Sequence, residues 1–309
     1  MFTSAHRSLL RCALPIVVVG LFAVFIGNVA AQQGAQPLPA QLGPKALAGV
    51  KRATVRLQVT IADGEKASGS GFFALQPGIV ITNAHVVGML GKQSKDPKEI
   101  AVVLNSGQAN EESLKATVVG VDRINDLAVL RVEGKDLPAP LPIETQRELF
   151  ETQKAYVFGF PLGIQLGKDI TISETSISSL RTFGTDKVQQ VQVNGGIHPG
   201  NSGGPIVNTD GAVIGVSVAI IRGSQLNFAV PGHFVSSLAS GRITDNHLGE
   251  AFLDKGKITL PVRFACLDPL DQVKEVRVDV WAGMPGKPLS AATQRPRPDQ
   301  ATAKERPST

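Results

Sequence analysis

The sequence predicts an all-β protein built from many short strands. Of its 309 residues, 32 are glycine and 20 are proline, whereas aromatic residues make up only 5%. This composition favours a turn-rich β fold over a helical bundle. Apolar and polar side chains alternate in short runs, as at Val55, Leu57, Val59 and Ile61, which is the period of a half-buried strand. Turn residues separate these runs, so a barrel or a sandwich is expected.

Residues 1–31 indicate an export signal or a membrane anchor. Arg7 and Arg11 form a positive start, an apolar run follows, and Val29-Ala30-Ala31 fits a small-residue cleavage site. The cleavage site favours a cleaved signal, although the apolar run is near the length of a membrane-spanning helix. Both alternatives export the rest of the chain. Residues 32–46 are proline-containing and predict a linker, with a short helix beginning at Pro44.

The strand pattern falls into two halves, joined by a proline-rich crossover at 137–142. In the first half we expect strands at 53–62, 68–73, 78–87, 100–104, 115–121 and 127–132. In the second half we expect strands at 155–160, 170–180, 188–193, 205–207, 212–221 and 225–230. Pro231 then predicts a helix to about Ser240, because proline is tolerated in the first turn of a helix.

The C-terminal region divides into a β extension and a tail. Within residues 249–282, a small β extension of unknown role, Lys257–Cys266 and Lys274–Trp281 alternate as strands do and predict a hairpin or part of a small β unit. Residues 283–309 hold five prolines and no aromatic residue, which predicts a disordered tail.

Cysteines and net charge add two further expectations. Cys266 is the one cysteine after the leader, so we expect it to be a small buried hydrophobe, with intermolecular pairing as the less favoured alternative. The net charge of +5 is too mild to indicate nucleic-acid binding, and no nucleic acid is expected as a partner.

One short motif indicates a nucleophile. Residues 200–205 have the sequence GNSGGP, which places Ser202 in a turn flanked by glycines. Glycine reaches backbone angles that are closed to other residues, so two N–H groups can point at one spot. The N–H groups of Gly200 and Ser202 are therefore a candidate oxyanion hole. A serine hydroxyl also needs a base to take its proton.

His85 and Asp126 are the candidate partners of Ser202. His85 follows a predicted strand in the segment TNAHVV at 82–87, and Asp126 precedes the apolar run DLAVLRV at 126–132. Asp122 is the rival carboxylate, but it is expected to lie in a solvated turn, so Asp126 is preferred. The order His, Asp, Ser is that of the chymotrypsin-like catalytic triad.

With these motifs, the chain resembles a trypsin-like serine protease of the HtrA/Deg type. Further matching segments are GFPLG at 159–163, TISETSISSLR at 171–181, HPGNSGGPIVN at 198–208 and NFAVP at 227–231. The resemblance implies a protease domain at 47–248, formed by two six-stranded antiparallel β-barrels with the triad between them. It also implies polypeptide substrates, no metal or cofactor, and a homotrimer as a candidate assembly. Residues 249–309 are too short for the PDZ domain that the family commonly carries, so no complete PDZ domain is expected.

Two departures from the trypsin pattern suggest which substrate residue the enzyme prefers at P1 and how its activity is controlled. Gly196 stands where trypsin-like enzymes have an aspartate at the floor of the pocket for the P1 residue, the substrate residue before the cleaved bond. A P1 lysine or arginine would therefore bury an unpaired charge. With Ile197, Val218 and Ile220 as further candidate substrate-binding residues, a small apolar P1 is expected. Asn201 replaces a zymogen-type aspartate, which argues against activation by N-terminal clipping.

Taken together, the sequence predicts an exported, periplasmic or envelope-associated serine endopeptidase that acts on unfolded or damaged proteins. The alternative is a non-catalytic protein of the same fold that binds or chaperones polypeptides.

Overall fold

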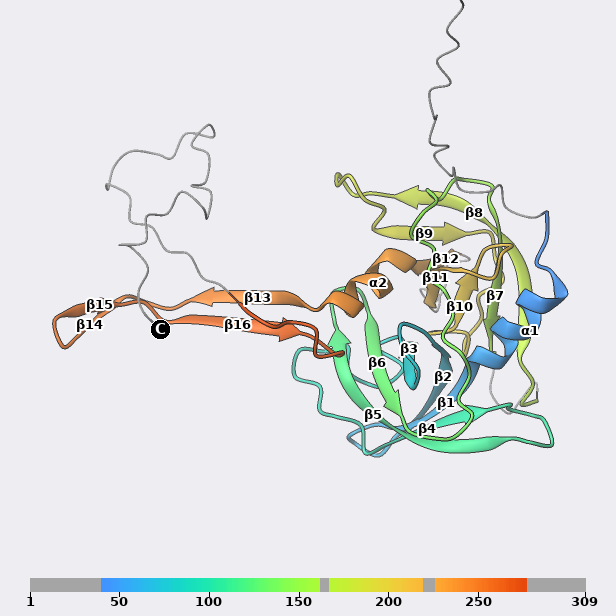
Figure 1. Cartoon of the computed structure of the whole chain (residues 1–309), viewed down its shortest axis with the longest axis horizontal. Coiled ribbons are helices and arrows are strands. Elements are labelled where there is room, and N and C mark those ends of the chain that lie inside the picture. Colours follow the sequence, from blue (N-terminus) through green and yellow to red (C-terminus); the bar gives the residue numbers. More distant parts are fainter. Residues whose placement is uncertain (1–39, 162–166, 219–225, 277–309) are drawn as a thin grey trace, which may run out of the picture. The chain divides into compact units, whose positions relative to one another are not determined.

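The computed structural model describes residues 40–161, 167–218 and 226–276, and its strands close into two barrels (Figure 1). The first barrel has the strand order β1-β2-β3-β6-β5-β4, with every neighbouring pair antiparallel. Its strands are β1 (Thr54–Thr60), β2 (Lys66–Phe73), β3 (Ile79–Thr82), β4 (Glu99–Leu104), β5 (Glu112–Asp122) and β6 (Leu127–Val132). The barrel is closed because β1 pairs with both β2 and β4.

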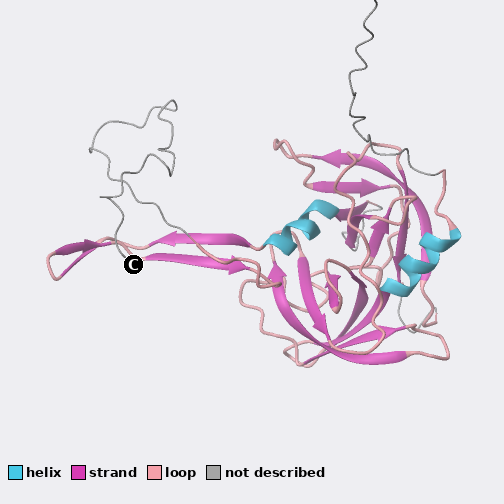
Figure 2. Ribbon diagram, viewed as in Figure 1, coloured by secondary structure: helices cyan, strands magenta, loops and turns pink. Residues whose placement is uncertain are grey.

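The second barrel has the order β10-β11-β12-β9-β8-β7 and is closed by the pairing of β10 with β7. Its strands are β7 (Lys154–Gly159), β8 (Thr171–Arg181), β9 (Gln190–Val193), β10 (Pro205–Val207), β11 (Val213–Val218) and β12 (Asn227–Pro231). The all-β fold with two six-stranded antiparallel barrels is thus confirmed, and Figure 2 shows how strongly strands dominate. The largest boundary difference is at β3, which was expected to run through Val87 but ends at Thr82.

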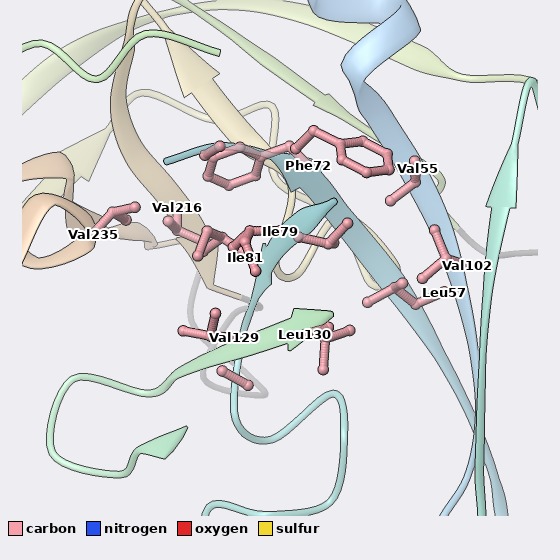
Figure 3. Packing of buried hydrophobic residues seen from close by; sticks show 14 of the residues in the cluster. Val55, Leu57, Phe72, Ile79, Ile81, Val102, Val129, Leu130, Val216 and Val235 are labelled. Carbon is pink, nitrogen blue, oxygen red and sulfur yellow. The ribbon is translucent and has the colours of Figure 1, made fainter. Parts of the chain in front are cut away.

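The cores of the barrels explain why the alternating segments form strands. In β1 the side chains of Val55, Leu57 and Val59 are fully buried, as their period of two requires. Figure 3 shows the first-barrel core around Phe72, with Val216 of the second barrel in the same cluster. Replacing a buried phenylalanine by alanine costs about 3–5 kcal/mol. The apolar cluster therefore stabilises each half and also joins them.

The predicted crossover runs between the two barrels and bonds to both. Leu141 N–H donates to the Phe73 carbonyl (2.8 Å), and Val213 N–H donates to the Pro142 carbonyl (2.8 Å). Prolines suit this connection because each supplies a carbonyl acceptor without needing a partner for an N–H.

Two helices flank the barrels in the described part of the chain. Helix α1 (Pro44–Ala53) has proline in its first turn and buries Val50 and Ala53, which confirms the short helix expected from Pro44. Helix α2 (Gly232–Ser240) follows β12, as expected. Neither of these described helices is long and apolar enough to cross a bilayer. The predicted leader and C-terminal tail lie outside the described residues.

A hairpin follows α2, and we call residues 242–267 the arm. Strand β13 (Arg242–Leu248) pairs with β16 (Val262–Leu267), and beyond them β14 (Phe252–Asp254) pairs with β15 (Lys257–Thr259) (Figure 1). Residues 257–267 therefore pair with the preceding segment, 242–254, whereas the sequence had suggested 274–281 as the partner. Residues 274–276 form no strand, and 277–281 lie outside the described residues.

The base of the arm is fixed to the first barrel. The Arg242 guanidinium pairs with the buried Asp122 carboxylate at the end of β5. Gly120 leaves room for Leu267 and Pro269, because a Cβ at position 120 would lie 3.0 Å from the first and 2.9 Å from the second. Also at the base of the arm, Cys266 is exposed, so the expectation that it is buried was wrong. The reason is that no described layer packs over its face of β16.

Candidate active site

His85 lies on the turn that follows β3. The Thr82 hydroxyl donates to the Ser70 carbonyl (2.7 Å) and anchors the end of the strand. The chain then turns tightly, with Gly88 N–H donating to the His85 carbonyl (3.1 Å) and Met89 N–H donating to the Ala84 carbonyl (2.8 Å). This turn leaves the imidazole 33% exposed at the barrel edge, where a substrate can reach it.

Asp126 holds both the ring and the backbone of His85. Its Oδ2 lies 2.6 Å from His85 Nδ1, and its Oδ1 accepts a 2.9 Å hydrogen bond from the His85 N–H. The Asp126 backbone has a positive φ of 51°, and its carbonyl accepts a hydrogen bond from the Asn83 amide (2.8 Å). A carboxylate at Nδ1 places the proton there and leaves Nε2 free to accept one.

The rival carboxylate, Asp122, takes no part in this arrangement. The prediction that it lies in a solvated turn was wrong, because its side chain is buried. It accepts hydrogen bonds from Asn125 N–H (3.3 Å) and the Asn125 amide (2.7 Å), and it pairs with Arg242. Its charge is therefore used to join β5 to the arm, and Asp126 is the carboxylate that contacts His85.

Ser202 is the second residue of the second of two consecutive turns, which share Asn201. Asn201 N–H donates to the His198 carbonyl (2.9 Å), and Gly204 N–H donates to the Asn201 carbonyl (2.8 Å). The third residue of each turn is a glycine with positive φ, 99° at Gly200 and 84° at Gly203. Proline fixes a negative φ at position 199, and Ser202 is not among the residues with positive φ, so both turns are of type II.

The turn type decides where the Gly200 N–H points. Types I and II differ by a rotation of the central peptide plane, and the type II form requires positive φ at the third position. In the turn 198–201 the Gly200 N–H takes no part in the closing hydrogen bond. The orientation of the central peptide of the turn therefore decides where this N–H points.

Close packing brings Ser202 to the segment that carries His85. A Cβ on Gly203 would lie 2.2 Å from Thr82 Oγ1 and 3.1 Å from the Asn83 nitrogen. A Cβ on Gly69 would lie 2.7 Å from a Val86 methyl group and 3.2 Å from the Ser202 carbonyl. Glycine at these positions thus permits the two barrels to meet where the nucleophile and the base candidates lie.

Ser70 is a residue of this site that the sequence analysis did not single out. It is fully buried, and its hydroxyl donates to the Gly200 carbonyl (2.7 Å) and accepts from the Phe160 N–H (3.0 Å). Its own N–H donates to the Ser202 carbonyl (2.9 Å). The signal in the sequence was the serine between two glycines in SGSGFF, a pattern typical of close backbone approach.

The candidate substrate-binding residues have different environments. Gly196 has φ of 85°, and its carbonyl accepts a hydrogen bond from the buried Asn201 amide (3.2 Å). Ile197 is only 1% exposed and packs in the core of the second barrel. Val218 is half-buried at the end of β11, and Ile220 lies outside the described residues.

Residues 69–216 match the family model described as a trypsin-like peptidase domain. The chain is 33% identical over 203 residues to the serine protease HhoB of Synechocystis, covering 63% of this chain and 45% of the relative. It is 33% identical over 227 residues to a DegP-like periplasmic serine endoprotease of Chlamydia pneumoniae, covering 72% of this chain and 44% of the relative. The chain thus spans less than half the length of either relative.

Among solved structures, the HtrA-type protease AlgW bound to a tripeptide superposes with a TM-score of 0.52 and 26% identity. The alignment covers 63% of this chain and 62% of AlgW. Family model, relatives and solved structure agree with the fold of two closed six-stranded barrels. The chain therefore belongs to the HtrA-type trypsin-like serine proteases.

Proposed function

We propose that the chain hydrolyses peptide bonds through an acyl-enzyme, with Ser202, His85 and Asp126 as its catalytic triad. The observation that carries this proposal is the pair of contacts from one carboxylate to the ring and the backbone of His85. In the first step, Ser202 Oγ attacks the scissile carbonyl while His85 Nε2 takes the hydroxyl proton. His85 then gives this proton to the leaving amine. Water next attacks the acyl-enzyme, and His85 takes a proton from this water and returns it to Ser202 Oγ as the acid product leaves.

Asp126 and the turn at 198–204 support this chemistry. Asp126 keeps His85 in the useful tautomer and stabilises the imidazolium that forms. The N–H groups of Gly200 and Ser202 bind the oxyanion of the tetrahedral intermediate. The turn supports this role, because its closing hydrogen bond does not use the Gly200 N–H. The Asn201 side-chain amide holds the loop by donating a hydrogen bond to the Gly196 carbonyl, so no charged partner from a freed N-terminus is required.

A fluorophosphonate probe tests this function directly, because it bonds covalently to an activated serine. The wild-type chain is expected to be labelled and to degrade casein, and Ser202→Ala is expected to do neither. Ser68→Ala, which removes an exposed serine, is the matched control and retains both activities. A folded wild-type chain that neither takes the label nor cuts casein would instead favour a polypeptide-binding role.

Small apolar residues are the proposed P1 preference. Gly196 offers no carboxylate to a basic P1 side chain, and a buried unpaired charge is costly. Val218 contributes an apolar wall at the end of β11. Mapping the cut sites in an unfolded protein is expected to give mainly Val, Ala or Ile at P1, and predominant Lys or Arg would contradict the proposal.

Unfolded or damaged envelope proteins are the proposed substrates, and the periplasm is the proposed location. The predicted leader at 1–31 supports export, and one relative is named as a periplasmic serine endoprotease. Fractionation of the native host with and without an osmotic shock tests the location. Recovery of the chain in the cytosolic fraction would contradict it.

A further inference from the structure

The two faces of the arm differ in polarity. Along β15 and β16 an apolar side chain recurs at every second position, and alternate residues of a strand lie on one face. Strand pairing places Ile243 opposite Cys266, Leu248 opposite Val262, and Leu253 opposite Ile258. We call this surface the apolar face of the arm; its members are Ile243, Leu248, Leu253, Ile258, Leu260, Val262, Phe264 and Cys266.

The opposite face of the arm is mainly polar and charged, although it also carries Phe252 opposite Thr259, and Ala265 and Leu267 on β16. It carries His247 opposite Arg263, and Lys257 and Thr259 on β15. On the apolar face, the one polar side chain is the neutral Asn246, which lies opposite Phe264. An antiparallel sheet with such a division normally packs its apolar face on another layer.

No layer covers the apolar face within the described part of the chain. Leu248 is 63% exposed, Leu253 is 73% exposed and Ile258 is 80% exposed. A two-stranded hairpin is marginally stable by itself in water, and a contiguous exposed apolar patch of this kind marks an interaction surface. The arm therefore resembles one layer of a two-layer structure whose second layer is not among the described residues.

We propose that the apolar face of the arm packs against the same face of a second copy of this chain, in a two-fold symmetric contact. In such a contact each residue meets a surface identical to its own, which an uncharged apolar face permits. The opposite face is less suited to such a contact, because it would bury the charged side chains of Arg263 and of the opposed Lys257 and Asp254. The exposed area of the apolar face is on the order of 700 Å², close to the roughly 800 Å² per partner of stable interfaces.

Paired substitutions on adjacent residues test this contact. Leu248→Glu and Ile258→Glu place a charge on the apolar face, whereas His247→Glu and Thr259→Glu place it on the opposite face of the same strands. Sedimentation velocity of the full chain is expected to show a wild-type assembly of twice the mass of the L248E and I258E assemblies. H247E and T259E are expected to keep the wild-type mass.

The thiol of Cys266 gives an independent measurement on the same face. In a Cys12→Ser background it is the remaining cysteine, and maleimide is expected to label it at least tenfold faster in L248E than in the assembled protein. Equal masses of wild type and L248E, or a ratio other than two, would overturn the proposal. Slow labelling in L248E would also overturn it, since the face would then be covered by the chain itself.

These outcomes are independent of the catalytic proposal. Fluorophosphonate labelling of Ser202 is expected to be the same in L248E, H247E and wild type, because none of these substitutions touches the barrels. If neither the wild type nor any variant were labelled by the fluorophosphonate, the protease function would be contradicted. The ratio of the sedimentation masses would still test the proposed contact of the arm.

Discussion

The Ser70 hydroxyl of the first barrel donates a 2.7 Å hydrogen bond to the Gly200 carbonyl of the second. The peptide that follows Gly200 is thereby fixed from the side opposite to its turn hydrogen bond. Ser70 is thus a positioning residue: it orients the candidate oxyanion hole without reaching the substrate.

Ser70→Ala is expected to lower kcat between about 10-fold and 10²-fold with a smaller effect on KM, because a misplacement of about 1 Å near the reacting groups can cost about 10². The substitution also leaves the Phe160 N–H without its acceptor. Steady-state kinetics on a peptide substrate measure the effect, and Ser68→Ala, in the same motif but exposed, serves as the control. Equal loss of kcat in both variants would argue against this role.

Asp126→Asn is expected to lower kcat by about 10⁴, the size of the effect when a triad aspartate loses its charge and the histidine takes the wrong tautomer. The asparagine oxygen can keep the bond to His85 N–H, so its NH₂ then faces His85 Nδ1. The ring must accept there and carry its proton on Nε2, where it cannot take the serine proton. Kinetics of the folded variant measure this loss.

Asp122→Asn is the matched control for this change. It weakens the pair with Arg242 and should reduce stability, yet kcat per folded molecule is expected to stay at the wild-type value. A comparable fall in kcat in Asp122→Asn would mean that the wrong carboxylate has been assigned to the triad.

Gly200→Ala is expected to reduce kcat by about 10²–10³, the cost of one oxyanion-hole donor. At φ of 99° an alanine is strained, so the turn should change to a form that directs the N–H elsewhere. Gly184→Ala is the control, because Gly184 also has positive φ (80°) but no neighbouring atom within 4 Å of a new Cβ. Gly184→Ala should lower the stability of the fold somewhat and leave kcat unchanged.

Glu144 gives a prediction for how the stability of the fold depends on pH. Burial raises its pKa, but hydrogen bonds from Gln146 N–H, Arg147 N–H and the Arg147 guanidinium outweigh this, so the pKa lies below the usual 4.5. A carboxylate with a lowered folded-state pKa stabilises the fold above its unfolded-state pKa, and this stability is lost as the pH falls through the folded-state value. The contribution of Glu144 should therefore be complete at neutral pH and disappear below about pH 4.5.

Urea denaturation of Glu144→Gln and wild type measures this contribution. The side chain is 7% exposed, so the difference at pH 7 is expected to be about 1–3 kcal/mol, and it should shrink at pH 3.5. Glu174→Gln removes an exposed pair with Lys154 and should cost at most about 1 kcal/mol. A pH-independent difference for Glu144→Gln would contradict the charge-based explanation.

Strands and motifs were predictable because their signals are local. Alternation at Val55, Leu57 and Val59 indicates one buried face wherever the strand pairs, and the HtrA resemblance supplied the expectation of two six-stranded barrels. Within the site, the His85 and Asp126 contact followed from the motifs. What the motifs did not show was Ser70, whose importance depends on which carbonyl lies within reach of its hydroxyl.

The arm shows what period-two alternation leaves open. Lys257–Cys266 was predicted as a strand, but alternation does not specify a partner, and Arg242–Leu248 forms the pairs. The same limit applies to Asp122, which was taken as solvated because its partner, Arg242, is 120 residues away in the sequence. Cys266 was expected to be buried for the same reason, since a strand pattern does not say whether a second layer is present.

The crossover and the tight contacts at Gly69 and Gly203 connect the two barrels. The activity therefore depends on how the two barrels are aligned. Each half contributes part of the proposed triad, so a shift of one barrel against the other separates Ser202 from His85 while every strand keeps its partners. Mild denaturant or pressure should therefore abolish turnover before circular dichroism detects any loss of β structure. When native conditions are restored, turnover should recover at the rate at which the two barrels dock again, which is faster than the rate at which a barrel refolds.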